Sequence, residues 1–126
     1  MQQSAMTFEE MSRFIRAYME ERDWHNADPR GLATSIVLEA GELLEHYQWS
    51  DKAVGDKQAL AEELADVFVY AFQFAQTLDI DITEAIHAKL AKSALKYPAS
   101  DFKGKSGEAK TEAWMNAKLR HQKDGL

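Results

Sequence analysis

The apolar residues of this chain recur at three- and four-residue intervals in separate stretches, and each stretch predicts an amphipathic α-helix. The first stretch follows Thr7, which forms a capping box with Glu10. The second opens at Asp28, an N-cap residue that precedes a proline, and we expect this helix to run to about Gln48. The apolar positions of the first stretch are Phe8, Met11, Phe14, Ile15, Tyr18 and Met19.

The third stretch, from about Lys57 to Leu78, is apolar on more than one face, as expected of a helix at the centre of a bundle or at a subunit interface. The fourth begins with a second capping box, Asp81 to Glu84, and ends before Pro98. The sequence shows no strand pattern and no internal repeat. It therefore predicts an all-α, four-helix bundle with short connections.

The chain changes character after Pro98. Residues 100–107 are polar and include two glycines, whereas a short helix is predicted over residues 108–120 and frayed ends over residues 121–126. We therefore predict a helical domain over residues 1–98 and an extension over residues 99–126 that is partly helical or disordered. A thin bundle of this size often completes its burial by oligomerisation, which favours at least a dimer.

Composition narrows the range of functions. The 126 residues suffice for one domain, and the absence of cysteine excludes a disulfide framework and a thiolate zinc site. A net charge of −6 argues against a nucleic-acid polymer as ligand, although metal ions can supply positive charge for a small phosphate compound. No signal-peptide pattern is visible, and the longest apolar-rich run, Val67 to Ala75, is too short to span a bilayer. We therefore expect a cytoplasmic protein without membrane attachment.

Two short acidic motifs carry the candidate chemistry: Glu39 with Glu42, and Glu63 with Asp66. Residues three apart lie on one face of a helix, with Cβ atoms roughly 5–6 Å apart. If the second and third helices pack together, four carboxylates converge, and a cation relieves their repulsion. Oxygen ligands suit Mg²⁺, with Mn²⁺ as the alternative. The competing interpretation, that these acids are ordinary solvated residues, is weakened by the apolar residues beside them.

Other short motifs agree with a known family. They are Glu21-Arg22-Asp23-Trp24, Pro29-Arg30, Gln48-Trp49 and Lys96-Tyr97-Pro98. Together with the two acidic motifs, which 20 residues separate, they make residues 8–98 resemble the MazG-like, all-α nucleoside triphosphate pyrophosphohydrolases, and within them the dCTP pyrophosphatase group. The resemblance implies Mg²⁺ bound by the four acids. It also implies cleavage of a nucleoside triphosphate into monophosphate and pyrophosphate, by dimers that often pair into tetramers.

The resemblance also suggests catalytic and base-binding residues. Glu39 and Glu63 are the candidate catalytic carboxylates, and we favour Glu39 as the general base because a carboxylate not fully used in coordination can accept a proton. Trp24 and Trp49 are expected to stack on the base. They flank opposite ends of the second helix, so for both to contact one nucleotide either the chain that enters this helix folds back or a second subunit contributes one of them, Trp24 by preference. Tyr70 lies one turn after Asp66 and is expected to bound the sugar pocket.

The fourth helix is expected to contact the phosphates and the sugar. Lys89, Lys96 and Tyr97 match the family pattern there, whereas Ser93 stands where the family has an asparagine. This departure leaves the substrate open, with pyrimidine deoxynucleotides as the best analogy. The alternative is that the lysines form a solvated basic face that also favours a helix C-terminus.

Simpler interpretations and other functions compete with this assignment. Trp24 and Trp49 are also candidates for the core, and Tyr70 for a structural place in the bundle. His46, one turn after Glu42, could reach the rim of the site but is expected to be solvated. A di-iron carboxylate bundle needs two Glu-x-x-His pairs, but only Glu84 with His87 fits that pattern. The remaining alternative is a non-catalytic, metal-binding helical interaction module.

Overall fold

The computed structural model describes residues 4–122, in which all regular structure is helical. The predicted all-α fold class is therefore confirmed. Among these residues the chain divides into two compact units between Ile82 and Thr83, which we describe one at a time. The elements are α1 (Phe8–Glu21), α2 (Pro29–Glu45), α3 (Lys57–Thr77), α4 (Ile82–Lys96), the short 3₁₀ helix η1 (Ala99–Asp101) and α5 (Gly107–Gln122).

Side-chain caps begin the helices of the first unit where the sequence predicts them. Thr7 Oγ1 accepts a hydrogen bond from the Glu10 N–H at 3.1 Å. Asp28 Oδ2 accepts one from the Gly31 N–H at 3.1 Å, with Pro29 in the first turn of α2. Asp56 caps α3 in the same way, with its Oδ1 accepting a hydrogen bond from the Ala59 N–H at 3.0 Å. These caps satisfy backbone donors that have no partner within the helix.

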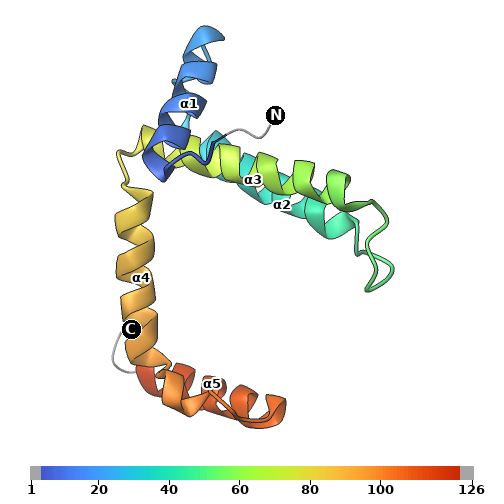
Figure 1. The fold of residues 1–126 in the computed structure, drawn as a ribbon, viewed down its shortest axis with the longest axis vertical. Coiled ribbons are helices and arrows are strands. Elements are labelled where there is room, and N and C mark those ends of the chain that lie inside the picture. The colour runs from blue at the N-terminus through green and yellow to red at the C-terminus, as the bar shows by residue number, and fades with distance from the viewer. Residues whose placement is uncertain (1–3, 123–126) are drawn as a thin grey trace. The chain divides into compact units, whose positions relative to one another are not determined.

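Helices α2 and α3 lie side by side, joined by a loop (Figure 1). Helix α2 ends at Glu45, three residues before the expected Gln48, because the chain turns at His46. The His46 carbonyl accepts a hydrogen bond from the Val54 N–H at 2.8 Å, which closes the loop on the end of α2. This pairing of the two helices is what brings the acidic motifs together.

Helix α1 packs against α3 through a small core of Ile15, Met19 and Phe72, with Val69 at its edge. The rings of Phe8 and Phe72 stack with centroids 4.8 Å apart. A polar contact adds to this junction, because Gln76 Nε2 donates to the Ser12 carbonyl at 2.8 Å. The core of the first unit therefore sits where α1 meets α3.

A Schellman motif ends α1 and directs the chain toward α2. Asp23 has a φ of 57°, the left-handed conformation that such a motif requires. The Asp23 N–H donates to the Glu20 carbonyl, and the Trp24 N–H donates to the Met19 carbonyl at 2.8 Å. The backbone of Trp24 is therefore fixed by the end of α1.

The second unit contains α4, η1 and α5, and burial within it is slight. No residue of α4 is buried, and Ala117 is the buried residue of α5. The Tyr97 ring meets the edge of Phe102 at 6.1 Å, and Ser106 Oγ caps α5. Helix α5 corresponds to the helix expected over residues 108–120. It also includes His121 and Gln122, which were expected to be frayed, whereas the rest of that predicted segment, residues 123–126, lies outside the described residues. The functional boundary at Pro98 stays a prediction.

Large apolar side chains remain exposed on both paired helices of the first unit. Val37 and Leu38 of α2 are 71% and 63% exposed, and Phe68 of α3 is 53% exposed. Over the described residues, no helix is both long enough and apolar enough to cross a lipid bilayer.

Candidate metal centre and adjoining cavity

The α2–α3 pair brings the four predicted acids into one cluster. Oxygen atoms of Glu39, Glu42, Glu63 and Asp66 all lie within 4.8 Å of one another. Glu39 and Glu63 are partly buried, whereas Glu42 and Asp66 are exposed. Each helix therefore contributes one sheltered carboxylate and one that faces solvent, in the arrangement that the three-residue spacing predicts.

Crowding of these acids makes their charged forms unfavourable. Burial raises the pKa of Glu39 above its ordinary value of 4.5, as do a hydrogen bond with Glu42 and the negative charges of Glu42, Asp66 and Glu63. The pKa of Glu63 is raised chiefly by a hydrogen bond with Glu42 and then by burial, while His46 acts in the opposite direction. Repulsion and desolvation both favour a bound proton or a bound cation.

The cluster fits a divalent metal ion. Glu39 Oε2 is buried and has no hydrogen-bond partner, which is costly for a carboxylate oxygen unless something else satisfies it. Hard oxygen donors from four carboxylates are the kind of ligand set that Mg²⁺ and Mn²⁺ prefer. The four residues could therefore hold a metal ion.

His46 is a neighbour of this cluster, a position that the sequence allowed but did not favour. Its side chain is only 15% exposed, so the expectation of a solvated histidine is wrong. The ring extends from the end of α2, and its Nε2 lies 3.7 Å from Glu63 Oε1. The signal in the sequence was its position one turn after Glu42. The decisive partner, the Gly55 N–H, lies across a loop whose conformation the pattern does not predict.

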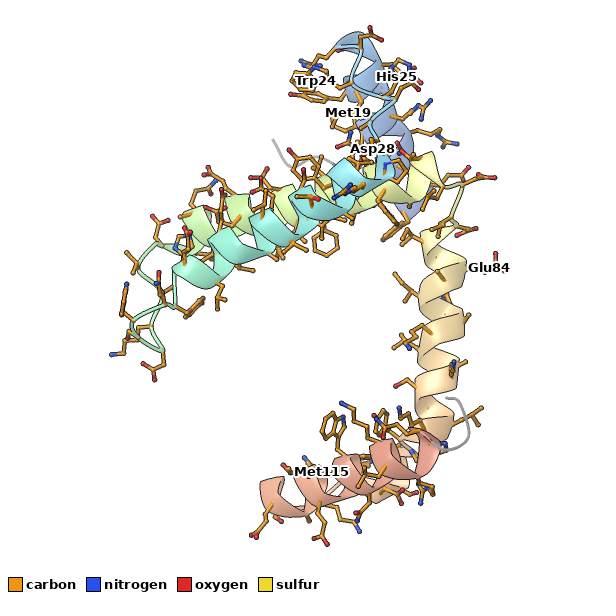
Figure 2. All side chains as sticks on the ribbon, turned by 180° about the vertical axis from the view of Figure 1, so that it is seen from behind. Met19, Trp24, His25, Asp28, Glu84 and Met115 are labelled. Carbon is orange, nitrogen blue, oxygen red and sulfur yellow. The ribbon has the colours of Figure 1, made fainter. Side chains whose placement is uncertain are left out.

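A cavity of about 630 Å³ adjoins the acids within the first unit. Trp24, Asp66 and Tyr70 all contribute to its wall, together with the buried Gln73. Figure 2 shows Trp24 and Met19 near the turn between α1 and α2, close to Asp28. One chain supplies both Trp24 and Tyr70 to this cavity. The expected contribution of a tryptophan from a second subunit stays a prediction.

Other predicted site residues are not part of this wall. Trp49 lies in the loop after α2 and is 86% exposed, which rules out a core position within this chain. In the second unit, Lys89, Ser93 and Lys96 share one face of α4, and Tyr97 directly follows this helix. These four residues line a small cavity of about 170 Å³, together with Lys92. Their roles in binding a substrate stay predictions.

Fold and site together define a class of protein: an all-α chain with two acidic i, i+3 motifs that converge on a candidate divalent-metal centre. Residues 34–111 match the MazG-like family model. This chain belongs to the MazG-like family.

Two mammalian relatives show the same sequence identity to this chain. The chain is 34% identical to mouse dCTP pyrophosphatase 1 over 107 residues, which cover 78% of this chain and 63% of that protein. The human dCTP pyrophosphatase 1 is 34% identical over 102 residues, or 74% of this chain and 60% of that protein. The chain thus spans less than two thirds of the length of these relatives.

A solved structure agrees with this assignment. The crystal structure of a pyrophosphatase from Archaeoglobus fulgidus matches with a TM-score of 0.66 and 30% identity. The match covers 78% of this chain and 98% of that one. Helical architecture and family membership therefore rest on two independent kinds of similarity.

Proposed function

We propose that this protein hydrolyses a nucleoside triphosphate to the monophosphate and pyrophosphate in a reaction that requires Mg²⁺ or Mn²⁺. The observation that carries the proposal is the four-carboxylate cluster, with an unpartnered buried oxygen on Glu39, directly beside a cavity. The names of the relatives, dCTP pyrophosphatase and pyrophosphatase, support the same reaction.

The four acids would hold the metal, and Glu39 and Glu63 are the catalytic candidates among them. Bound Mg²⁺ supplies charge neutralisation on the phosphates and a more acidic water. Water attacks the α-phosphorus, the bond from that phosphorus to the oxygen bridging to the β-phosphate breaks, and pyrophosphate leaves with the bond electrons. Glu39 takes the proton from water, because a carboxylate that is not fully used in coordination can act as a general base.

The cavity beside Asp66 receives the nucleoside. Its volume of about 630 Å³ lies within the range of roughly 300–1,000 Å³ that is usual for small-molecule sites. Trp24 supplies an aromatic face on which a base stacks, and Tyr70 bounds the sugar. Asp66 belongs both to the wall of this cavity and to the acid cluster, so a nucleoside bound here would have its triphosphate near the metal.

The basic face of α4 binds phosphate oxygens. Lys89, Ser93, Lys96 and Tyr97 offer two ammonium groups and two hydroxyls around one small cavity. Ammonium groups pair well with phosphate, and a hydroxyl both donates and accepts hydrogen bonds. Ser93 is shorter than an amide side chain, so its contact with the sugar or base sets part of the substrate preference.

The working form is a homodimer or a tetramer built from two dimers. Exposed apolar residues on α2 and α3, among them Val37, Leu38 and Phe68, favour burial against a second copy. In the same association, the exposed Trp49 of one subunit reaches the nucleotide that is bound by a neighbouring subunit. A monomeric mass by light scattering at micromolar concentration would contradict this part of the proposal.

The preferred substrate is a pyrimidine deoxynucleoside triphosphate, by analogy with the relatives named dCTP pyrophosphatase. A cytoplasmic role on the free nucleotide pool stays a prediction. A panel of natural and modified triphosphates with Mg²⁺, read out as released pyrophosphate, tests the proposal. Turnover of at least one nucleotide is expected, and no turnover of any would favour the non-catalytic interaction module.

A further inference from the structure

The side chain of His46 links the loop after α2 to the acid cluster. Its Nδ1 accepts a hydrogen bond from the Gly55 N–H at 3.1 Å. On the other side of the ring, Nε2 lies 3.7 Å from Glu63 Oε1. Both side chains are sheltered, with 15% and 24% exposed. The imidazole therefore stands between a fixed backbone donor and one carboxylate of the candidate metal centre.

The hydrogen bond from the Gly55 N–H determines which nitrogen of the His46 ring carries the proton. An Nδ1 atom that accepts an N–H bond has its lone pair engaged, so the proton of the neutral ring resides on Nε2. That N–H is on the side of the Glu63 carboxylate. A donor held in this place favours one orientation of the carboxylate over the others.

Gly55 is fitted closely to the ring. A Cβ atom at this position would lie 2.5 Å from His46 Cε1 and 2.7 Å from Nδ1. Real Cβ atoms do not approach a ring so closely, so any larger residue must displace the ring or the loop. The absence of a side chain at position 55 is therefore a condition for the contact between the backbone and His46.

We propose that His46 is a positioning residue for the metal centre: anchored by the Gly55 N–H, it orients Glu63 for coordination. This inference rests on the proposed metal-dependent function. Ligating carboxylates are commonly held by hydrogen bonds from outside the ligand set, and loss of such a partner typically lowers metal affinity about 10- to 100-fold. A purely structural role in closing the loop would alter stability and leave metal affinity unchanged.

The first test is His46→Phe in the full-length protein, with Mn²⁺ alone as the probe. Titration calorimetry measures the dissociation constant for Mn²⁺, and thermal unfolding without metal measures stability. Phenylalanine keeps a ring of similar size and removes both polar nitrogens. We expect Mn²⁺ affinity to fall at least about tenfold. Unchanged affinity with a lowered melting temperature would overturn the inference and leave His46 as a loop clamp.

A double-mutant cycle with Gly55→Ala supplies an independent test. Alone, Gly55→Ala should weaken Mn²⁺ binding because its methyl group displaces the His46 ring. In the His46→Phe background the same change should have no further effect on affinity, since the polar link is already lost. Additive losses in affinity would contradict the inference. Gly107→Ala is the matched control, because a Cβ there meets nothing within 4 Å.

Failure of this inference and failure of the proposed function give different results. If the unmodified protein binds Mn²⁺ and cleaves nucleotides but neither variant changes the affinity, only the role of His46 is overturned. If the unmodified protein binds no Mn²⁺ at all, the metal centre itself is wrong and the positioning role falls with it.

Discussion

The carboxylate cluster and the basic face of α4 are the two charged regions that the proposed reaction needs, and they are built in different ways. The acids come from two helices that pack on each other, and two of the four are partly buried. The lysines come from one helix on which no residue is buried. Packing within the first unit brings the acids together, whereas helix periodicity alone aligns the lysines of the second unit. The acids should therefore tolerate little substitution. The function of the basic face should depend on the partner with which the chain associates.

The largest expected effect is the loss of a clustered carboxylate. Glu42→Gln should lower kcat/KM at least about a hundredfold, because metal-assisted charge stabilisation contributes several kcal/mol to such reactions. The same variant should remain folded without metal, since Glu42 raises the pKa of both Glu39 and Glu63 and its removal relieves repulsion. Steady-state kinetics and thermal unfolding check the two halves of this expectation.

Glu62→Gln is the matched control for this comparison. Glu62 is exposed, lies on the same helix one residue before Glu63 and belongs to no metal cluster among the described residues. It should retain nearly full activity. Equal losses for Glu42→Gln and Glu62→Gln would show that overall charge, rather than the cluster, governs the reaction.

The next effect concerns the basic face. Lys89→Met should lower kcat/KM about 10- to 100-fold, because a hydrogen bond to a charged group contributes about 1.5–3 kcal/mol. Lys103→Met, a change in the exposed segment before α5, is the control and should have little effect. If Lys89→Met retains full activity, α4 is a solvated basic face and the comparison between the two charged regions loses its functional meaning.

Substitution of the two tryptophans distinguishes the base contact that one chain provides from the base contact that a second copy adds. Trp24→Ala should raise KM about 5- to 150-fold with a smaller change in kcat, since stacking contributes about 1–3 kcal/mol per base. Trp49→Ala should also raise KM, but only when the protein is a dimer or a tetramer. An unchanged KM for Trp24→Ala would remove the nucleoside from the cavity beside Asp66.

The smallest expected effect is on how the free energy of unfolding changes with pH. The pKa values of Glu39 and Glu63 are raised in the folded protein, so above the ordinary value of 4.5 the folded state binds more protons than the unfolded state. These two groups should therefore lower the free energy of unfolding as pH rises from that value through their raised pKa values. Comparison with the double variant Glu39→Gln/Glu63→Gln isolates the contribution, and an identical pH slope would contradict it. Mg²⁺ should restore stability at neutral pH in the unmodified protein alone.

The sequence predicted the helices and the acids for a clear physical reason. Capping side chains at Thr7 and Asp28 act on backbone groups only a few residues away, and the three-residue spacing of the acids needs only helical geometry. What it missed depends on the chain beyond one helix. His46 ended α2 early and became sheltered because a loop folds back over it, with Gly55 close to its ring.

The position of Trp24 was missed for a related reason. It follows from a left-handed residue at Asp23, which closes the Schellman motif at the end of α1. Asparagine and glycine are the usual residues there, so an aspartate gave no clear signal. The place of Trp49 and of the α4 lysines in a complete site depends on contacts between units or between copies, and helical periodicity contains no information about these.

We propose that water attacks the α-phosphorus of a nucleoside triphosphate at a metal centre that the four acids would hold. The most direct test is turnover of dCTP with Mg²⁺ in ¹⁸O-labelled water, with the products followed by phosphorus NMR and mass spectrometry. The account predicts dCMP that contains the label, unlabelled pyrophosphate, and no reaction when the metal is chelated. Label in pyrophosphate or in orthophosphate, or turnover that continues without metal, would contradict it.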